Sequence, residues 1–148
     1  MVYEALFVAP GADQFPRTVL GEPQIAHYAK DFGRPGDYGL VAETSAGLPI
    51  GAAWVRRFSR NDPGYGYVDD DTPELSIAVI KKSRGTGVGT ALLVQLLVEV
   101  PRCSLSVDHR NPAVRLYERL GFEMVDRSGD SLTMLRRQLT VEPMANWK

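Results

Sequence analysis

Short β-type runs alternate with polar segments in the first half of the chain. "VYEALFVA" (Val2 to Ala9) predicts a first strand. Arg17 to Lys30 predicts an irregular helical region, most regular at Gln24 to Lys30. Two further runs, "YGLVAET" and "PIGAAWVRRFS", flank the turn-like segment Ser45 to Leu48 and predict a β-hairpin.

After a long polar loop, Arg60 to Thr72, the pattern changes to a strand followed by an apolar helix. "ELSIAVI" predicts the strand, the helix begins near Gly85 and ends at Pro101, and "CSLSV" predicts the next strand. Strand, helix and strand in this order imply a right-handed crossover with locally parallel pairing.

The last third of the chain predicts a short helix and a second hairpin. In "NPAVRLYERLG", Asn111 is a suitable N-cap, Pro112 suits the first turn and Gly121 ends the helix. "FEMVDR" and "SLTMLRRQL" form a hairpin around Ser128 to Asp130. The whole pattern predicts an α+β fold, with a mostly antiparallel sheet interrupted by one parallel crossover.

Composition limits the class of protein. The 148 residues, 44% apolar and 24% charged, predict a single globular domain over residues 1–148. A net charge of −1 argues against a nucleic-acid binder. The N-terminus does not resemble a signal peptide and no run of eighteen apolar residues occurs, so we expect a cytoplasmic protein without a membrane partner. One cysteine, Cys103, and two histidines predict neither a disulfide nor a metal site.

The helix after the third predicted strand opens on three glycines, Gly85, Gly87 and Gly89. The first N–H groups of a helix have no intrahelical partners, and the helix dipole adds about half a positive charge there. Glycines let an anion such as a phosphate approach these groups closely. Lys81, Lys82 and Arg84 add positive charge beside this turn.

Other interpretations of this turn remain open from the residues alone. The glycines would also permit close packing of helix and sheet. No lysine follows them, which disfavours the Walker pattern of nucleoside triphosphatases. A dinucleotide-binding fold would use the same order of elements, with Asp108 about twenty residues beyond the glycines. The third glycine of that fingerprint, however, falls on Thr90.

Two motifs resemble the GNAT superfamily of acyl-CoA-dependent N-acetyltransferases. "RGTGVG" (Arg84 to Gly89) matches the R/Q-x-x-G-x-G/A signature, and "NPAVRLYERLGF" (Asn111 to Phe122) is similar to the second half of the family's site. The resemblance covers roughly Glu74 to Leu139. Two positions depart from the family pattern, with Lys81 where proline is common and Val114 where a small residue is common.

The resemblance implies acetyl-CoA as co-substrate. Its pyrophosphate would bind the backbone N–H groups of Arg84, Gly85, Gly87, Val88, Gly89 and Thr90. Its pantetheine arm would lie along Ile77, Ala78 and Val79, because in this family that strand splays from the strand of "CSLSV". An N–H near Ala78 or Val79 would stabilise the developing oxyanion. Asn111 would contact the pantetheine arm, although an ordinary N-cap explains it equally well.

The resemblance also suggests an acid and a base. Tyr117 would protonate the leaving thiolate, the alternative being a core tyrosine on one helix face with Val114 and Leu120. Glu74 is the candidate base for the amine, directly or through water. The acidic run Val68 to Glu74 could attract a cationic amine or form a solvated loop end. Tyr65 and Tyr67 could line an acceptor pocket. His27 and His109 are expected at the surface or in turns, and Cys103 is expected to be a buried strand thiol.

The sequence therefore predicts a GNAT-like enzyme that transfers an acetyl group from acetyl-CoA to a primary amine by direct attack in a ternary complex. The acceptor, a small molecule or a peptide, is not specified by the sequence, and the resemblance makes a homodimer plausible. A dinucleotide-dependent oxidoreductase and a non-catalytic CoA-binding sensor are the alternatives.

Overall fold

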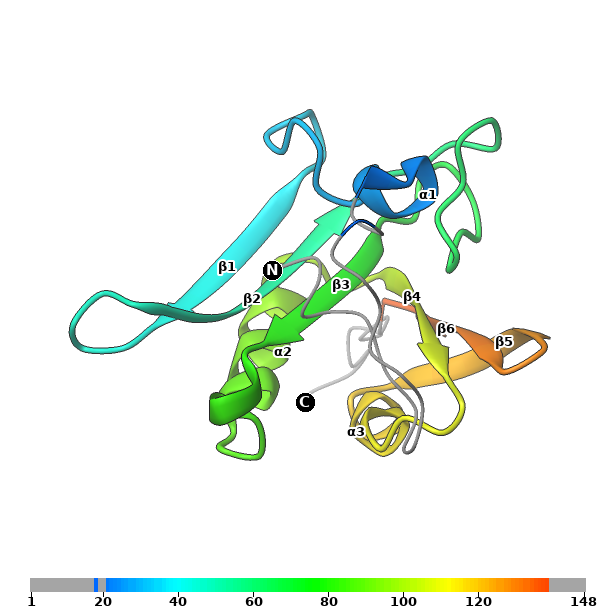
Figure 1. Cartoon of the computed structure of the whole chain (residues 1–148). Coiled ribbons are helices and arrows are strands. Elements are labelled where there is room, and N and C mark those ends of the chain that lie inside the picture. The colour runs from blue at the N-terminus through cyan, green and yellow to red at the C-terminus, as the bar shows by residue number, and fades with distance from the viewer. Residues whose placement is uncertain (1–17, 19–20, 139–148) are drawn as a thin grey trace, which may run out of the picture.

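The computed structural model describes residues 18 and 21–138 of the 148-residue chain (Figure 1). The strand predicted at Val2 to Ala9 lies outside these residues. In chain order the elements are α1 (Pro23–Ala26), β1 (Tyr38–Glu43), β2 (Pro49–Arg56), β3 (Glu74–Val79), the 3₁₀ turn η3 (Lys81–Ser83), α2 (Val88–Glu99), β4 (Cys103–Asp108), α3 (Ala113–Arg119), β5 (Phe122–Ser128) and β6 (Ser131–Arg136).

The six strands form one sheet in the order β1-β2-β3-β4-β6-β5. Every neighbouring pair is antiparallel except β3 and β4, which are parallel and joined through α2. Both predicted hairpins, β1–β2 and β5–β6, are present. The predicted α+β fold, with one parallel crossover in an antiparallel sheet, is confirmed.

The parallel strands β3 and β4 separate almost as soon as they meet. Their register contains only the pair Glu74 and Ser104, whereas β2 pairs with β3 along the whole of β3. Beyond this pair the two strands diverge. Figure 1 shows a V-shaped opening between β3 and β4 (the V), whose narrow end is at Glu74 and Ser104. The sheet is thus split at its centre, and the split opens toward the end of β3, where the chain turns into α2.

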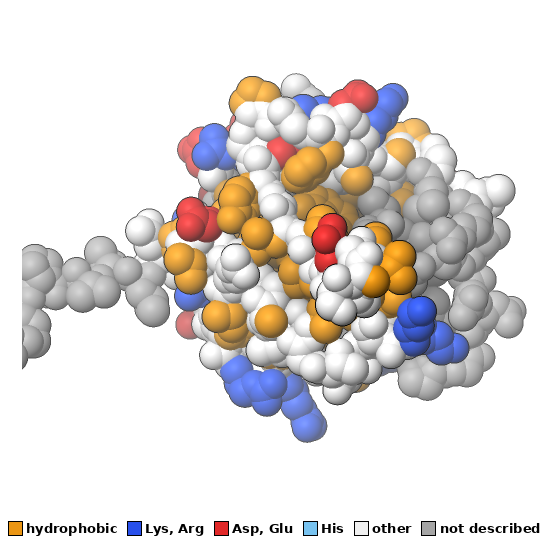
Figure 2. All heavy atoms as spheres, turned by 90° about the vertical axis from the view of Figure 1, so that its left-hand side faces the viewer, with side chains coloured by type: hydrophobic (Ala, Val, Ile, Leu, Met, Phe, Trp, Pro, Cys, Tyr) orange, Lys and Arg blue, Asp and Glu red, His pale blue; other side chains and the backbone are white. Residues whose placement is uncertain are grey.

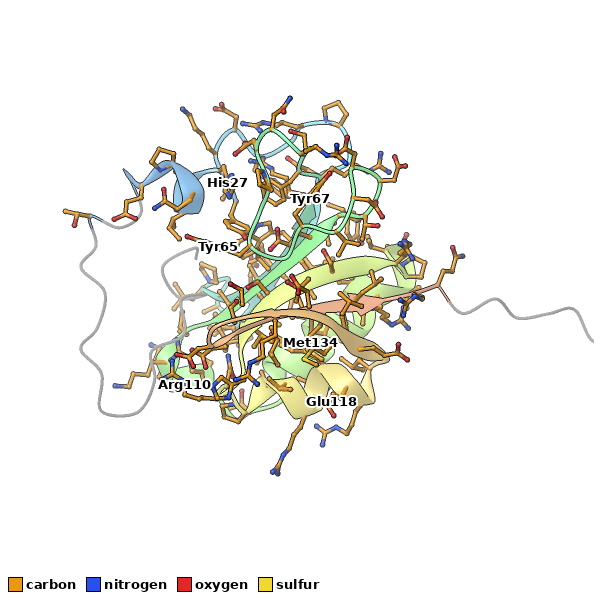
Figure 3. All side chains as sticks on the ribbon, turned by 90° about the vertical axis from the view of Figure 1, so that its right-hand side faces the viewer. His27, Tyr65, Tyr67, Arg110, Glu118 and Met134 are labelled. Atoms are coloured by element: carbon orange, nitrogen blue, oxygen red, sulfur yellow. The ribbon has the colours of Figure 1, made fainter. Side chains whose placement is uncertain are left out.

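The two faces of the sheet carry different side chains because successive residues of a strand point to opposite sides. Leu75 and Ile77 of β3 and Leu105 of β4 belong to the main core, which packs against α2 and α3. Glu74 and Ser104 belong to the other face. Figure 3 shows α2 and α3 below the sheet, with α1 and the loop that precedes β3 above it.

Helix α2 contacts the core through four leucines and leaves valines on its outer side. Leu92, Leu93, Leu96 and Leu97 are buried. Val94 and Val98 are 50% and 74% exposed, so the helix is apolar on both sides. Viewed from the β1 side, apolar side chains reach the surface over a broad area, with Lys and Arg side chains toward the periphery (Figure 2).

Two helix boundaries differ from the prediction. The first helix covers Pro23–Ala26 and continues only as turns, so the regular stretch predicted at Gln24 to Lys30 is shorter and begins earlier. Asn111 lies two residues before α3, but its Oδ1 accepts a hydrogen bond from the Ala113 N–H at 2.9 Å and so caps the helix as expected. Gly121, with φ +94°, ends it.

Candidate functional site

The glycine turn at the start of α2 owes its glycines to backbone conformation. Gly85 and Gly87 have φ of +75° and +89°, a region that residues with a β-carbon rarely occupy. A β-carbon built at either position would meet nothing within 4 Å. Close packing of helix and sheet, the alternative drawn from the sequence, therefore does not explain them.

Gly89 has a different status, because it lies within α2 and has no positive φ. A β-carbon there would meet Val79 and Ile77 at 3.6 and 3.7 Å, which are ordinary contacts. Nothing in the described protein therefore requires glycine at this position, although glycine is unfavourable in a helix. A bare backbone facing a ligand would explain it.

The amides at the start of α2 are available to a ligand. The Ala91 N–H donates to the Gly87 carbonyl at 3.0 Å, which leaves the amides of Val88, Gly89 and Thr90 without carbonyl partners in the helix. The Arg84 amide is engaged differently, since it donates to the Lys81 carbonyl at 3.3 Å. Arg84 is the least accessible donor of the predicted set.

Positive charge surrounds this turn. Lys81 and Lys82 are exposed in η3. The Arg84 side chain is directed back to β3, where its Nε donates to the Val79 carbonyl at 2.9 Å. The turn is thereby tied to the end of the strand that borders the V, so the anion site and the split in the sheet are adjacent.

The hydrogen-bond register decides which backbone groups of β3 face the V. The Ile80 N–H donates to Ile50 of the β2 side at 2.9 Å, while the Ser104 N–H donates to the Pro73 carbonyl at 3.0 Å. Because these directions alternate along a strand, the N–H groups of Ile77 and Val79 face β4 and that of Ala78 faces β2. Of the two predicted oxyanion donors, only Val79 is oriented toward the V.

The turn after β4 holds Asp108 in an ion pair. Its carboxylate accepts hydrogen bonds from the Arg110 backbone N–H at 2.9 Å and from Arg110 Nε and Nη2 at 2.9 and 2.6 Å. These contacts hold the pKa of Asp108 below its usual range. A carboxylate engaged in this way is poorly suited to bind a ribose. The dinucleotide alternative also lacks its parallel sheet, since β3–β4 is the one parallel pair among the described strands.

Tyr117 lies in the core between α3 and the sheet. Its ring contacts Phe122 edge-on, with the centroids 5.8 Å apart, and the residue is 6% exposed. Burial raises the pKa of Tyr117 to about 12, so its hydroxyl remains protonated at neutral pH. A core position and a proton-donor role are compatible here, because a donor must carry its proton.

Glu74 is a buried carboxylate at the narrow end of the V. Oε1 accepts hydrogen bonds from the Tyr28 hydroxyl and the Gly66 N–H, both at 2.8 Å. Burial raises the pKa of Glu74 to about 7, against the lowering effect of these two donors. Among the described residues, three buried side-chain polar atoms have no hydrogen-bond partner: Glu74 Oε2, Ser104 Oγ and His27 Nε2. A carboxylate with this pKa can accept a proton near neutral pH.

The loop before β3 contacts this carboxylate through two glycines that the sequence did not single out. A β-carbon on Gly64 would lie 1.7 Å from Glu74 Oε2, and one on Gly66 would lie 2.5 Å from the Leu105 carbonyl carbon. The loop therefore packs directly on Glu74 and on β4. The clustered glycines of "PGYGY" were a signal for close approach, but nothing near Tyr28 indicated its contact with Glu74.

The carboxylates of the acidic run Val68 to Glu74 differ in burial and in their partners. Tyr67 donates a hydrogen bond to Asp70, and Asp69 lies 3.6 Å from Arg102 at a partly exposed position. Only Glu74 is fully buried. Tyr65 is 58% exposed and stacks on Tyr28, with the ring centroids 6.5 Å apart.

The burial of Cys103, His109 and His27 can be compared with what the sequence predicted for them. Cys103 is fully buried, and burial raises its pKa to about 12, which agrees with a strand thiol. His109 lies in a turn and contacts Asp130 at 3.1 Å. His27 lies in the turn after α1, in agreement with the expectation of a surface or turn position, but its side chain is only 11% exposed, with Nδ1 2.9 Å from Asp62. It is packed because its ring lies against Tyr28 and Phe58.

Two further kinds of site were sought in the described part of the chain. No group of three or more His, Cys, Asp or Glu side chains is arranged to hold a metal ion there. None of the helices in those residues has the length and apolar character needed to cross a membrane.

Comparisons with known proteins agree with this geometry. No curated protein matches the sequence. A Bordetella pertussis protein assigned to the GNAT-family acetyltransferases is 21% identical with a TM-score of 0.61, over 91% of this chain and 86% of that one. The phosphinothricin acetyltransferase of Sinorhizobium meliloti, crystallised with acetyl-CoA, is 27% identical with a TM-score of 0.54, over 68% of this chain.

The chain spans less than two thirds of some of these proteins. It covers 60% of the Sinorhizobium meliloti enzyme and 64% of PH1933 from Pyrococcus horikoshii, to which it is 28% identical with a TM-score of 0.52 over 67% of this chain. Residues 35–124 match the family model described as an acetyltransferase (GNAT) domain. These residues include the split pair β3–β4, the glycine turn and α3, and the chain therefore belongs to the GNAT acetyltransferase family.

Proposed function

We propose that this protein transfers the acetyl group of acetyl-CoA to a primary amine by direct attack in a ternary complex. One observation carries the proposal: β3 and β4 separate after a single register pair, next to a helix whose first amides have no helical partners. A split of this kind offers strand-edge groups to an extended amide-bearing chain, and the helix start offers donors to a diphosphate.

The residues around the V suit the parts of the coenzyme. The pyrophosphate would bind the backbone N–H groups at the start of α2, with Lys81 and Lys82 nearby. A pantetheine amide would pair with Ile77, whose backbone groups face the V, while the Val79 N–H, the other donor on this edge, is left for the acetyl carbonyl because the Val79 carbonyl already accepts from Arg84. The full proposed set is Arg84, Gly85, Gly87, Val88, Gly89 and Thr90 for the pyrophosphate, and Ile77, Ala78, Val79 and Asn111 for the pantetheine arm.

Two side chains on opposite faces of the sheet supply the proton transfers. Glu74, at the opposite end of β3 from Val79, accepts a proton from the ammonium form of the acceptor by way of water, which makes the nitrogen nucleophilic. The nitrogen then bonds to the acetyl carbon as the carbon–sulfur bond breaks, while the Val79 N–H donates to the carbonyl oxygen. Tyr117 donates its proton to the departing sulfur, and the nitrogen releases its second proton as the amide forms, which restores the Tyr117 hydroxyl by way of water. The two residues are well separated for these roles, because Tyr117 lies in the helix-side core and Glu74 on the opposite face.

The acceptor is an amine on a small molecule or a peptide. Binding of a cation is favoured by Glu74, a buried carboxylate that is not engaged in an ion pair, whereas the buried carboxylate of Asp37 is paired with Arg56. One structural relative crystallised with acetyl-CoA is named as a phosphinothricin acetyltransferase, which is an acetyl transfer to a small molecule.

Thermal unfolding with separate ligands tests the cofactor. Acetyl-CoA at about one hundred times its Kd stabilises the fold by about 2.7 kcal/mol, which raises Tm by roughly 5–10 °C. NADH at the same concentration is expected to leave Tm unchanged, and a response to NADH alone would contradict the proposal. A screen of primary amines for release of free thiol from acetyl-CoA then distinguishes an enzyme from a CoA-binding sensor, which binds without turnover.

A further inference from the structure

Tyr28 stands just after α1, in a segment that is anchored to the sheet by a buried cation. The Arg56 guanidinium of β2 forms an ion pair with Asp37 at 2.7 Å, with both side chains almost fully buried. It also donates to the carbonyls of His27 and Lys30 at 3.0 and 2.6 Å. These carbonyls flank Tyr28 on either side, so the backbone that carries Tyr28 is fixed against β2.

The Tyr28 hydroxyl connects Glu74 with the loop before β3. It donates to Glu74 Oε1 at 2.8 Å and accepts from the Tyr65 N–H at 2.7 Å. The next amide of the loop, that of Gly66, donates to the same Oε1 at 2.8 Å. One hydroxyl and two successive loop amides therefore hold one carboxylate oxygen.

The two oxygens of Glu74 are consequently unlike one another. Oε1 accepts two hydrogen bonds, whereas Oε2 has no partner among the described residues and lies against Gly64. A hydrogen bond to a carboxylate stabilises its charged form and fixes its rotamer. The oxygen left without a donor is the one to which a proton will be added.

We infer that Tyr28 is a positioning residue for Glu74: its hydroxyl holds Oε1 and the 65–66 segment together, and thereby fixes Oε2, which is buried against Gly64, as the oxygen that takes up the proton. This inference rests on the proposed function, in which Glu74 is the base. It adds a role for a residue that lies 46 positions earlier in the chain than the carboxylate it orients.

The other charged and titratable groups around Glu74 are directed to other partners, and the one buried nitrogen among them without a partner is His27 Nε2. Arg56 is the register partner of Glu74 on β2, but its guanidinium is directed to Asp37. His27 contacts Asp62, and Tyr65 stacks on Tyr28 from the loop. Ser104 on β4 contributes only a hydroxyl. Tyr28 is therefore the one side-chain donor to Glu74 among the described residues, and it lowers the pKa of Glu74 against the larger effect of burial.

The test is the pH profile of kcat/KM for Tyr28→Phe, measured with an amine that the wild-type enzyme acetylates. Loss of the hydroxyl removes a donor to the carboxylate, so the acidic limb is expected to move upward by about one pH unit. Activity should recover toward the wild-type value at alkaline pH, where Glu74 is ionised in both proteins. Tyr38→Phe, which removes a tyrosine hydroxyl from β1, is the matched control and should leave the limb in place.

A double variant separates positioning from general support of the fold. In a Glu74→Gln background, Tyr28→Phe should cause little further loss of kcat/KM, because the group that it orients is no longer a base. Equal loss of activity at every pH, or an undiminished effect in the Glu74→Gln background, would overturn the inference.

A second readout does not depend on activity. Glu74 lowers folding stability over a pH range that begins at its unfolded pKa and ends at its folded pKa of about 7. The upper end of this range, measured by urea unfolding, should also move upward by about one unit in Tyr28→Phe. An unmoved transition rejects the role of Tyr28 whether or not any amine is acetylated. A wild-type protein that acetylates no amine would reject the proposed function alone, since the urea series still reports on the contact between Tyr28 and Glu74.

Discussion

Replacing Glu74 with Gln should make the protein more stable than the wild type as pH rises. Glu74 is 2% exposed, and burial raises its pKa from an ordinary 4.5 to about 7. Gln has nearly the same shape, and its Oε1 can still accept from Tyr28 and Gly66. The substitution thus removes the ionisation while it preserves both hydrogen bonds to this oxygen.

The sign and size of the effect follow from proton linkage. Below pH 4.5 the carboxyl is protonated in both the folded and the unfolded chain, so it does not oppose folding. Between pH 4.5 and about 7 the unfolded chain binds fewer protons than the folded one, and wild-type stability falls as pH rises. A difference of about 2.5 pH units corresponds to about 3 kcal/mol. Above pH 7 this loss stays constant.

The measurement is the free energy of unfolding in urea at a series of pH values and constant ionic strength. The stability of Glu74→Gln relative to wild type should rise by about 3 kcal/mol between pH 4 and pH 8. Glu43→Gln, at an exposed position on β1, controls for the loss of one negative charge. A difference that is flat with pH, or that grows toward acid, would refute the assignment of a raised pKa to Glu74.

Two further substitutions test the cofactor end of the site. Gly89→Ala is expected to raise folding stability by about 0.5–1 kcal/mol, because alanine suits a helix and its β-carbon would meet only ordinary contacts. The same change should weaken acetyl-CoA binding about tenfold, the equivalent of one lost hydrogen bond; an unchanged Kd by calorimetry would contradict this position for the pyrophosphate. Tyr117→Phe should lower kcat by roughly 10²-fold with little change in acetyl-CoA affinity. Unchanged turnover in a thiol-release assay would exclude Tyr117 as the acid.

Local patterns were enough to predict most of the fold. The strand runs, the Pro and Gly positions and the order strand, helix, strand specified the hairpins and the parallel crossover, because these depend on residues that are close in the chain. The glycine turn could also be predicted from the sequence, since Gly85 and Gly87 have the positive φ that favours glycine. The first helix was predicted too long, since its interior lacks the packing that stabilises a regular helix: none of its residues is buried.

The candidate base was named from the sequence, but its environment was not foreseeable. The burial of Glu74, the contact with Tyr28 and the approach of Gly64 and Gly66 join segments that are distant along the chain. The same holds for His27, which was expected at the surface or in a turn and lies in a turn, but with its ring packed against two aromatic rings. Such contacts depend on which loops meet over the sheet, and no local periodicity encodes that.

By itself, then, the sequence determined most of the described helices and strands and the glycine-rich start of α2, and it named a candidate acid and a candidate base. Only the tertiary structure decided that β3 and β4 separate after Glu74 and Ser104, and that Val79 rather than Ala78 turns its N–H toward the V. It also decided that Oε1 of Glu74 accepts hydrogen bonds while Oε2 is left without a donor. The physical reason is that secondary structure follows from neighbouring residues, whereas desolvation and hydrogen-bond partners depend on segments brought together by folding.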